Sequence, residues 1–269
     1  MPSTNGFQFT PDDLEILHWV YSLRLAHIGH LQALTGRSEK ALARRLVKLC
    51  ANRYLATVTQ RPRKHLYVVG SEGLPILIEA GFAPDEILGH RPRHFELKEI
   101  WLNHFLLVVD THVRLILVTR GSGVEVVRWQ EGPALWDSVT IQVNGVSERA
   151  PVRPDAFFAL RNILQTTAKA TQYFFLEADR STMSHARIEA KIRAYVNYFQ
   201  QGLHREKYPG MKLFQVLVLT QTAARAENLA TAMRPAIPGG AQRWYHFLPL
   251  EKLSLEALLP AFSPVSGTA

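Results

Sequence analysis

Cysteine and long apolar runs are both scarce in this sequence. Cys50 is the only cysteine among 269 residues, so no internal disulfide can form and a reducing, cytoplasmic environment is expected. No stretch approaches the roughly 18 consecutive apolar residues of a membrane-spanning helix, and the first residues lack a basic start followed by an apolar run. With Gly 16 and Pro 15, the chain is also too poor in both residues for a low-complexity segment. We therefore expect a soluble globular protein without a membrane partner.

Several catalytic and metal-binding motifs are missing as well. The Gly-Ser-Gly run at 121–123 has no following P-loop lysine, and no Gly-x-Ser-x-Gly elbow occurs. A cysteine-based zinc site would need more than one cysteine. His90 and His94 have the spacing of helical metal ligands, but Pro92 between them argues against a regular helix. Nucleotide-binding, serine hydrolase and zinc-binding functions therefore have no support in the sequence.

Positive charge is the most unusual property, and it is concentrated in one window. The chain carries 31 Lys+Arg against 23 Asp+Glu, a formal net charge of +8. Between residues 37 and 64 there is one acid, Glu39, so nine bases minus one acid account for the whole excess. The nine bases are Arg37, Lys40, Arg44, Arg45, Lys48, Arg53, Arg61, Arg63 and Lys64. Such a concentration favours a polyanionic partner, with a solvated basic face as the alternative.

This window falls in a segment with helical periodicity. Thr10 and Pro11 are typical of a helix start, and Ser38 is expected to cap a third helix with leucines on one face and cations on the other. The predicted helices cover about 11–24, 28–34 and 38–54. Two apolar runs, at 55–58 and 65–69, flank a turn containing Pro62 and indicate a β-hairpin. Three helices followed by a hairpin predict a winged helix-turn-helix domain over residues 1–83, with a further helix at 71–82.

In a winged helix, the third helix enters the major groove and the hairpin lies against the phosphate backbone or an adjacent groove. The sequence therefore predicts double-stranded DNA as the partner. The predicted DNA-binding residues are Arg37, Ser38, Lys40, Arg44, Arg45 and Lys48 around the third helix and Arg61, Arg63 and Lys64 in the hairpin turn. Cys50 lies beside the apolar positions of the helix and is interpreted as core filling.

The second part of the chain has a different order of elements. After a polar linker at 84–95, a long apolar helix is expected at about 97–117, and the remaining elements alternate between strands and helices. The predicted strands are 124–130, 138–143, 152–160, 171–179, 213–220 and 243–250, with helices at 183–202 and 222–233. This order predicts an α/β domain of the restriction-endonuclease type over residues 96–250, so that the whole chain is α+β. Residues 251–269 form a carboxy-terminal segment whose tail is expected to be disordered.

Three carboxylates fall on the predicted strands with a spacing that suggests a site. Strand alternation places Glu177 and Asp179 on one face, and Asp155 can join them if its strand is an antiparallel neighbour. The pattern resembles the P-D…(D/E)-x-K signature of that nuclease superfamily, in which carboxylates bind Mg²⁺ and a lysine helps to activate water. Here Asp179 stands where the lysine belongs, and Lys191 on the next helix is a candidate replacement.

The same residues also allow a purely architectural interpretation. Clustered carboxylates repel one another unless metal, protons or bases compensate them. Arg153 and Lys191 could supply those bases in an inert network. Two hypotheses therefore stay open: a site that lacks catalytic activity and implies no cofactor, and a Mg²⁺-dependent endonuclease or nickase that uses Asp155, Glu177, Asp179 and Lys191.

Taken together, the chain resembles the replication-relaxation family of plasmid and mobile-element proteins over residues of about 10–250. The resemblance depends on RPDAFFAL at 153–160, YFFLEADRST at 173–182, the downstream Lys191 and Tyr195, His104, and RSEKALARRLVKLCANRYL at 37–55. It implies a DNA-binding protein that acts in transcriptional control, replication or DNA relaxation and transfer. Replication or transfer proteins would be further partners, and a homodimer would pair two half-sites on DNA.

Overall fold

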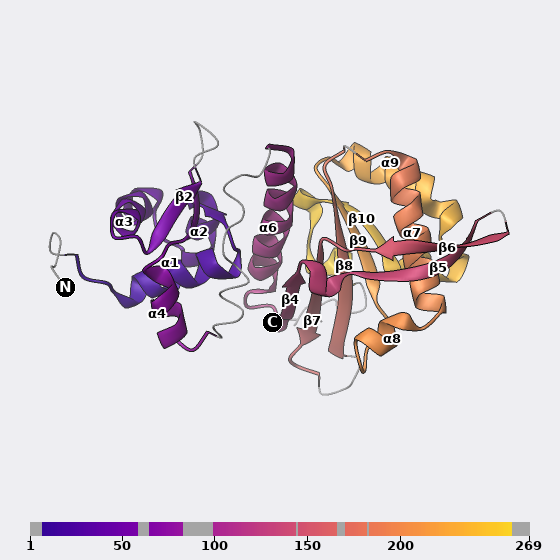
Figure 1. Ribbon diagram of the computed structural model, residues 1–269, viewed down its shortest axis with the longest axis horizontal. Helices are drawn as coiled ribbons and strands as arrows, with labels where there is room; N and C mark the ends of the chain where they lie inside the picture. The colour runs from indigo at the N-terminus through magenta and orange to yellow at the C-terminus, as the bar shows by residue number, and fades with distance from the viewer. Residues whose placement is uncertain are drawn as a thin grey trace, which may run out of the picture. The chain divides into compact units, whose positions relative to one another are not determined.

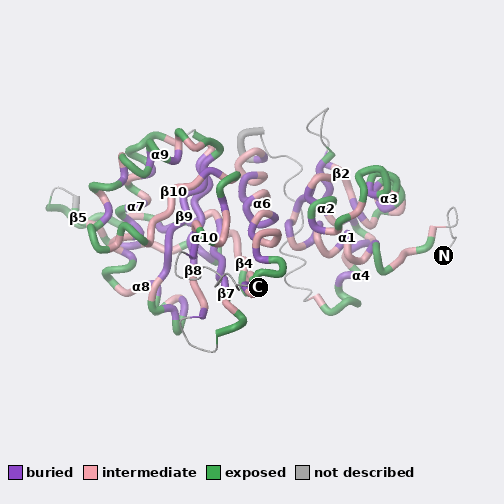
Figure 2. Tube along the Cα trace, turned by 180° about the vertical axis from the view of Figure 1, so that it is seen from behind, coloured by how far each residue is buried: buried purple, intermediate pink, exposed green. Residues whose placement is uncertain are grey.

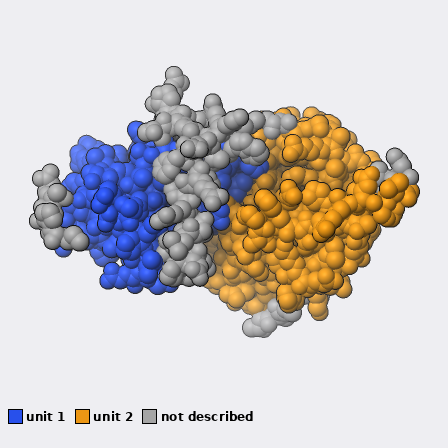
Figure 3. All heavy atoms as spheres, viewed as in Figure 1, with its two compact units in different colours: residues 1–113 blue, residues 114–269 orange. Residues whose placement is uncertain are grey.

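The computed structural model describes residues 7–58, 65–82, 99–143, 145–165, 170–181 and 183–259. The chain divides into two compact units, Met1–Val113 and Arg114–Ala269, which are coloured separately in Figure 3. The division falls inside a helix, whereas the predicted linker at 84–95 lies outside the described residues. Both units mix helices with strands, which confirms the α+β class.

The described part of the first unit contains the helices α1 to α4, the start of α6 and a small antiparallel sheet (Figure 1). The sheet has the order β1-β3-β2, and both pairings are antiparallel. Its elements are α1 (Pro11–Ser22), β1 (Ala26–His27), α2 (Ile28–Thr35), α3 (Glu39–Ala51), β2 (Leu55–Val58), β3 (Leu66–Val69) and α4 (Gly73–Glu79). The helices and the two hairpin strands lie within a few residues of their predicted positions.

Local sequence explains where α1 and α3 begin. The backbone N–H of Thr10 donates to the Asp13 carboxylate at 2.7 Å, which gives α1 the start of a capping box. The Ser38 hydroxyl accepts a hydrogen bond from the backbone N–H of Ala41, so Ser38 caps α3. Gly36 ends α2 with a φ of 72°, a conformation that glycine adopts without strain. Leu42, Leu46 and Leu49 on α3 are completely buried.

Helix α6 (Glu99–Thr119) is the long apolar helix of the chain. By length and composition, its segment Leu102–Thr119 is apolar enough to cross a membrane, the one such segment in the described part of the chain, and half of it is buried within the protein. Asp110 and Arg114 interrupt this segment. The combination is consistent with the core helix of a soluble protein.

The second unit is built on a five-stranded mixed sheet with the order β10-β9-β8-β7-β4. Strands β8, β9 and β10 are parallel, while β7 pairs antiparallel with both β8 and β4. The strands are β4 (Val124–Glu131), β7 (Ala156–Asn162), β8 (Thr171–Asp179), β9 (Gln215–Thr220) and β10 (Tyr245–Pro249). The two predicted strands that carry the carboxylates are therefore antiparallel neighbours.

One face of this sheet is covered by α7 (His185–Gln200) and α9 (Ala223–Met233), as Figure 1 shows. A separate hairpin of β5 (Asp137–Val143) and β6 (Val146–Val152) packs on α7. The unit also contains the short helices α8 (Leu203–Lys207) and α10 (Leu255–Leu258). The predicted single strand at 152–160 is wrong, because the chain leaves the hairpin after Val152 and enters the large sheet only at Ala156.

The buried face of α7 differs in part from the face that helical periodicity predicts, which carries Ile188, Ile192, Val196 and Phe199. Ile188 and Ile192 are buried as expected, but Tyr195 and Tyr198 take the next core positions. Phe199, which was assigned to the apolar face, is 38% exposed. Figure 2 shows the central strands of the sheet as the most continuously buried part of this unit. Tyrosines fit such positions when their hydroxyl groups find hydrogen-bond partners, and both of these do.

His246 on β10 should make the stability of the protein depend on pH. Its Nε2 hydrogen-bonds Gln215 Oε1 at 2.6 Å, and burial lowers the pKa of His246 from 6.5 to about 4. The unfolded chain takes up this proton near pH 6.5 and the folded chain does not, so stability is lost as the pH falls from 6.5 towards 4. The slope from this one group is at most about 1.4 kcal/mol per pH unit. Urea unfolding at several pH values should show a flatter profile for His246→Gln, and an unchanged profile would contradict this assignment.

Candidate functional site

Helix α3 carries a row of cations along the face opposite its buried leucines. Figure 2 shows this helix as a largely exposed segment with buried positions at intervals. Lys40, Arg44 and Lys48 follow one another at a spacing of four residues, so their side chains project from the same side of the helix. All three are exposed, and among the described residues no carboxylate lies within ion-pair distance of them. These three residues form what we call the α3 basic face. Their charges are available to an anionic partner.

Two nearby arginines, Arg37 and Arg45, form ion pairs within the protein. Arg37 pairs with Asp12 at 3.0 Å and with Glu15 at 2.6 Å, both on α1. Arg45 donates through Nε and Nη2 to the two carboxylate oxygens of Asp13 and also binds the carbonyl of Gln8 at 2.8 Å. Arg37, just before α3, and Arg45, on α3, therefore both form ion pairs with α1. Their charges are compensated within the protein, and their part in DNA binding stays a prediction.

The burial and the pKa of Asp13 indicate that its ion pair with Arg45 is part of the packed interior. The Asp13 side chain is completely buried, and burial by itself would raise its pKa. The hydrogen bonds from Arg45 and Thr10 outweigh burial and hold the pKa below its ordinary value. A buried carboxylate with four donated hydrogen bonds is a structural element of the unit.

The other predicted DNA-binding positions divide into one described residue and three that are not. Ser38 acts as the cap of α3, as its hydrogen bond to Ala41 shows. Arg61, Arg63 and Lys64 lie outside the described residues, so their role in the hairpin stays a prediction.

In the second unit, the structure brings Glu177, Lys191 and Tyr195 together. Glu177 on β8 is 2% exposed and projects towards α7. Lys191 Nζ donates to Glu177 Oε2, and the Tyr195 hydroxyl donates to Glu177 Oε1 at 2.6 Å. Both partners come from adjacent turns of α7. We call these three residues the Glu177 cluster.

Asp155 lies close enough to interact with the Glu177 cluster electrostatically, while Asp179 belongs to a different network. Asp155 raises the pKa of both Glu177 and Lys191, and its Oδ2 accepts the backbone N–H of Ala178 at 2.8 Å. Asp179 is completely buried and accepts hydrogen bonds from Arg225 Nε at 2.7 Å and from the Ser181 N–H at 3.1 Å. Arg153, a predicted partner of Asp155, instead places its guanidinium 4.9 Å from the ring centre of Trp136.

Electrostatics in the Glu177 cluster are dominated by burial. Burial raises the pKa of Glu177 to about 7, although Lys191 and Tyr195 act in the opposite direction. For Lys191, burial alone would lower the pKa, but Glu177 and Asp155 raise it above its ordinary value. Lys191 is therefore charged at neutral pH. It compensates a carboxylate that would otherwise be isolated in the core.

The three predicted metal ligands do not form a magnesium site in this arrangement. Mg²⁺ needs carboxylate oxygens that can face one ion. Each oxygen of Glu177 and of Asp179 already accepts a hydrogen bond, and Lys191 places a positive charge against Glu177. Among the described residues, the three carboxylates are not a group whose ligand atoms lie within 4.8 Å of one another. The residues present do not fit Mg²⁺.

Within the described ranges, one group of three possible metal ligands has its ligand atoms within 4.8 Å of one another: His27, His30 and Asp110. Each histidine Nδ1 accepts the other residue's backbone N–H, at 3.2 and 3.3 Å. In neutral imidazoles the proton then resides on Nε2, and His30 Nε2 donates to Asp110 Oδ1 at 2.6 Å. A metal ligand must offer a lone pair, so this group fits a hydrogen-bonded cap of α2 better than a metal site.

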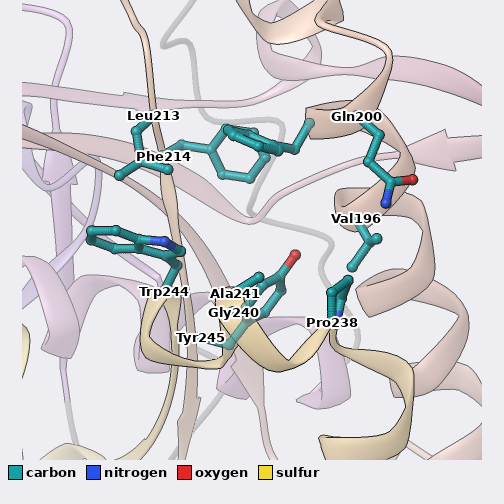
Figure 4. A pocket seen from close by; sticks show the side chains of 10 residues that line it. Val196, Gln200, Leu213, Phe214, Pro238, Gly240, Ala241, Trp244 and Tyr245 are labelled. Carbon is teal, nitrogen blue, oxygen red and sulfur yellow. The ribbon is translucent and has the colours of Figure 1, made fainter.

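A pocket of about 350 Å³ opens beside α7 in the second unit (Figure 4). Aromatic rings from Phe214, Trp244 and Tyr245 surround it, and the Gln200 amide lies at one side. The remaining lining residues are Val196, Phe199, Leu213, Pro238, Gly240 and Ala241. The lining contains no charged side chain. It therefore offers nothing to neutralise a phosphate group.

These features define a two-unit α+β protein that presents the α3 basic face on one unit and a buried, charge-compensated carboxylate cluster in the other. The chain belongs to the replication-relaxation family, whose model matches residues 17–213. This match confirms the resemblance seen in the sequence and indicates a role in the replication or relaxation of plasmids or other mobile elements. A search of curated proteins and a search of solved structures found no match.

Proposed function

We propose that this protein binds double-stranded DNA through a winged helix in its first unit. The order α1, β1, α2, α3, β2, β3 and the antiparallel sheet agree with that fold. In a winged helix, α3 is the helix that enters the major groove. Membership of the replication-relaxation family supports DNA as the partner.

The α3 basic face is the observation that carries this proposal. Its cations are exposed and have no carboxylate partner among the described residues, whereas Arg37 and Arg45 next to them are neutralised by α1. A rigid row of uncompensated charges gains free energy by releasing counterions from a nucleic-acid backbone. Lys40, Arg44 and Lys48 are accordingly proposed as the DNA contacts of the helix.

Direct titration tests the proposal. A fluorescently labelled 30-base-pair duplex of random sequence should bind the full chain at 50 mM salt, as measured by anisotropy. Unlabelled duplex DNA should displace the probe at lower concentration than single-stranded RNA of equal length. Absence of duplex binding would contradict the proposal, and preferential displacement by RNA would identify an RNA-binding module instead.

We propose further that the second unit has a restriction-endonuclease-like fold with an architectural carboxylate cluster. The engagement of Glu177 by Lys191 and Tyr195 supports this interpretation. The competing hypothesis, a metal-dependent nickase or endonuclease, is favoured only by the proximity of Lys191 and Asp155 to Glu177. It predicts cleavage of supercoiled plasmid with Mg²⁺ or Mn²⁺.

The cleavage assay separates the two hypotheses. We expect the chain to leave supercoiled plasmid intact with either metal. Metal-dependent nicking that is abolished in both Asp155→Ala and Glu177→Ala would contradict the architectural role.

A further inference from the structure

An exposed valine lies beside the α3 basic face. Val47 is 69% exposed, although α3 buries three leucines on its other side. Val47 follows Arg44 by three residues and Lys40 by seven, so it projects from the same side of the helix as these cations. One turn away in each direction lie Ala43 and Ala51, whose methyl groups are too short to cover it.

The positive charge around Val47 limits the kind of partner that can bind this side of α3. A protein partner would have to supply a carboxylate for each of Lys40, Arg44 and Lys48, because burying these cations unpaired is costly. A duplex instead provides phosphates at both edges of the major groove and base edges between them. The 5-methyl group of thymine is the apolar group displayed there. An apolar side chain beside a row of cations is complementary to that pattern.

We propose that Val47 contacts a thymine methyl group and thereby gives the protein a preference for thymine at one position of its DNA site. This inference rests on the proposed function, because it requires that α3 binds duplex DNA. Val47 is a specificity-determining residue in this account, and the surrounding cations supply most of the affinity.

Replacement of thymine by deoxyuracil tests the contact, since only the methyl group is removed. A preferred duplex is first selected from a random pool with the full chain, and each thymine is then replaced singly. At one position, the substitution should weaken binding by the wild-type chain about fourfold, equivalent to about 0.8 kcal/mol per buried methyl-sized group. The Val47→Ala variant should bind the thymine and uracil duplexes equally well at that position.

A matched control is available in the second unit. Val146 is 60% exposed on β6, and Val146→Ala should keep the fourfold effect of uracil. If the wild-type chain binds duplex DNA but Val47→Ala responds to every uracil as the wild type does, this inference is overturned and the proposed function stands. If the wild-type chain binds no duplex, the proposed function itself has failed.

Discussion

The Arg45→Ala variant is expected to lose about 3–5 kcal/mol of its free energy of unfolding, because it leaves a buried carboxylate without its charged partner. The Asp13 side chain is completely buried, and Arg45 donates to both of its oxygens. After the substitution, Thr10 alone supplies hydrogen bonds to Asp13, from its backbone N–H and its hydroxyl. Denaturant unfolding at pH 7, followed by circular dichroism, measures the loss.

The pH dependence of this loss gives a second signature. The lowered pKa of Asp13 means that its contribution to stability is present above the unfolded value of about 3.8 and disappears as the pH falls through the folded value. Without Arg45, the pKa of Asp13 rises. The difference in stability between variant and wild type should therefore shrink as the pH is lowered towards 4.

Arg44 supplies the matched control for Arg45. It is the adjacent residue on α3, it is exposed, and it belongs to the α3 basic face. Arg44→Ala should change the free energy of unfolding by no more than about 0.5 kcal/mol while weakening DNA binding. Equal destabilisation by the two substitutions would contradict the division of these arginines into a packing residue and a DNA-binding residue.

Substitution of Lys191 by methionine should produce the second large effect, about 3–5 kcal/mol at alkaline pH. Methionine keeps the aliphatic part of the side chain but removes the charge that compensates Glu177, which is 2% exposed. Glu177 can escape this penalty by holding a proton, so the loss should depend strongly on pH.

The sign of that dependence follows from the raised pKa of Glu177. With Lys191 present, burial already brings this pKa from 4.5 to about 7, and removal of Lys191 raises it further. The folded variant then keeps a proton that the unfolded chain releases, so its stability falls as the pH rises above 4.5. Unfolding at pH 5.5 and pH 9 should show the larger loss at pH 9. Lys191→Met combined with Glu177→Gln should recover stability at pH 9, and a loss independent of pH would contradict the proposed compensation.

Much of the fold could be predicted from hydrophobic periodicity. The strand at 171–179 has its predicted bounds, and β7 pairs antiparallel with β8, which is the condition under which Asp155 was expected to join Glu177. Strand β6 was missed, because VSERAPV contains few apolar residues and most of its length is exposed. Alternation of apolar and polar residues identifies strands that contribute side chains to a hydrophobic core. It does not report a hairpin strand that faces solvent.

Side-chain partners were harder to predict than elements. The pair of Asp179 with Arg225 joins positions 46 residues apart, and only the packing of α9 on β9 and β10, next to β8 in the sheet, brings them together. Arg45, by contrast, carried a readable signal: it lies three residues after Leu42 and four before Leu49, at the edge of the buried face. The count of nine bases between residues 37 and 64 does not distinguish cations that face solvent from cations that pair within the protein. Helical position distinguishes the inward-facing arginine from the outward-facing ones.

The most direct test of the account is the salt dependence of DNA binding. The triple variant Lys40→Ala, Arg44→Ala, Lys48→Ala removes the α3 basic face. The control triple Arg205→Ala, Arg234→Ala, Lys252→Ala removes three exposed cations of the second unit, so both variants fall from +8 to +5 (8 − 3 = 5). In a plot of log affinity against log salt concentration, the first variant should lose about 0.9 units of slope for each of its three lost phosphate contacts, and the control should keep the wild-type slope. Equal slopes for the two variants would show that DNA binding, if present, does not depend on α3.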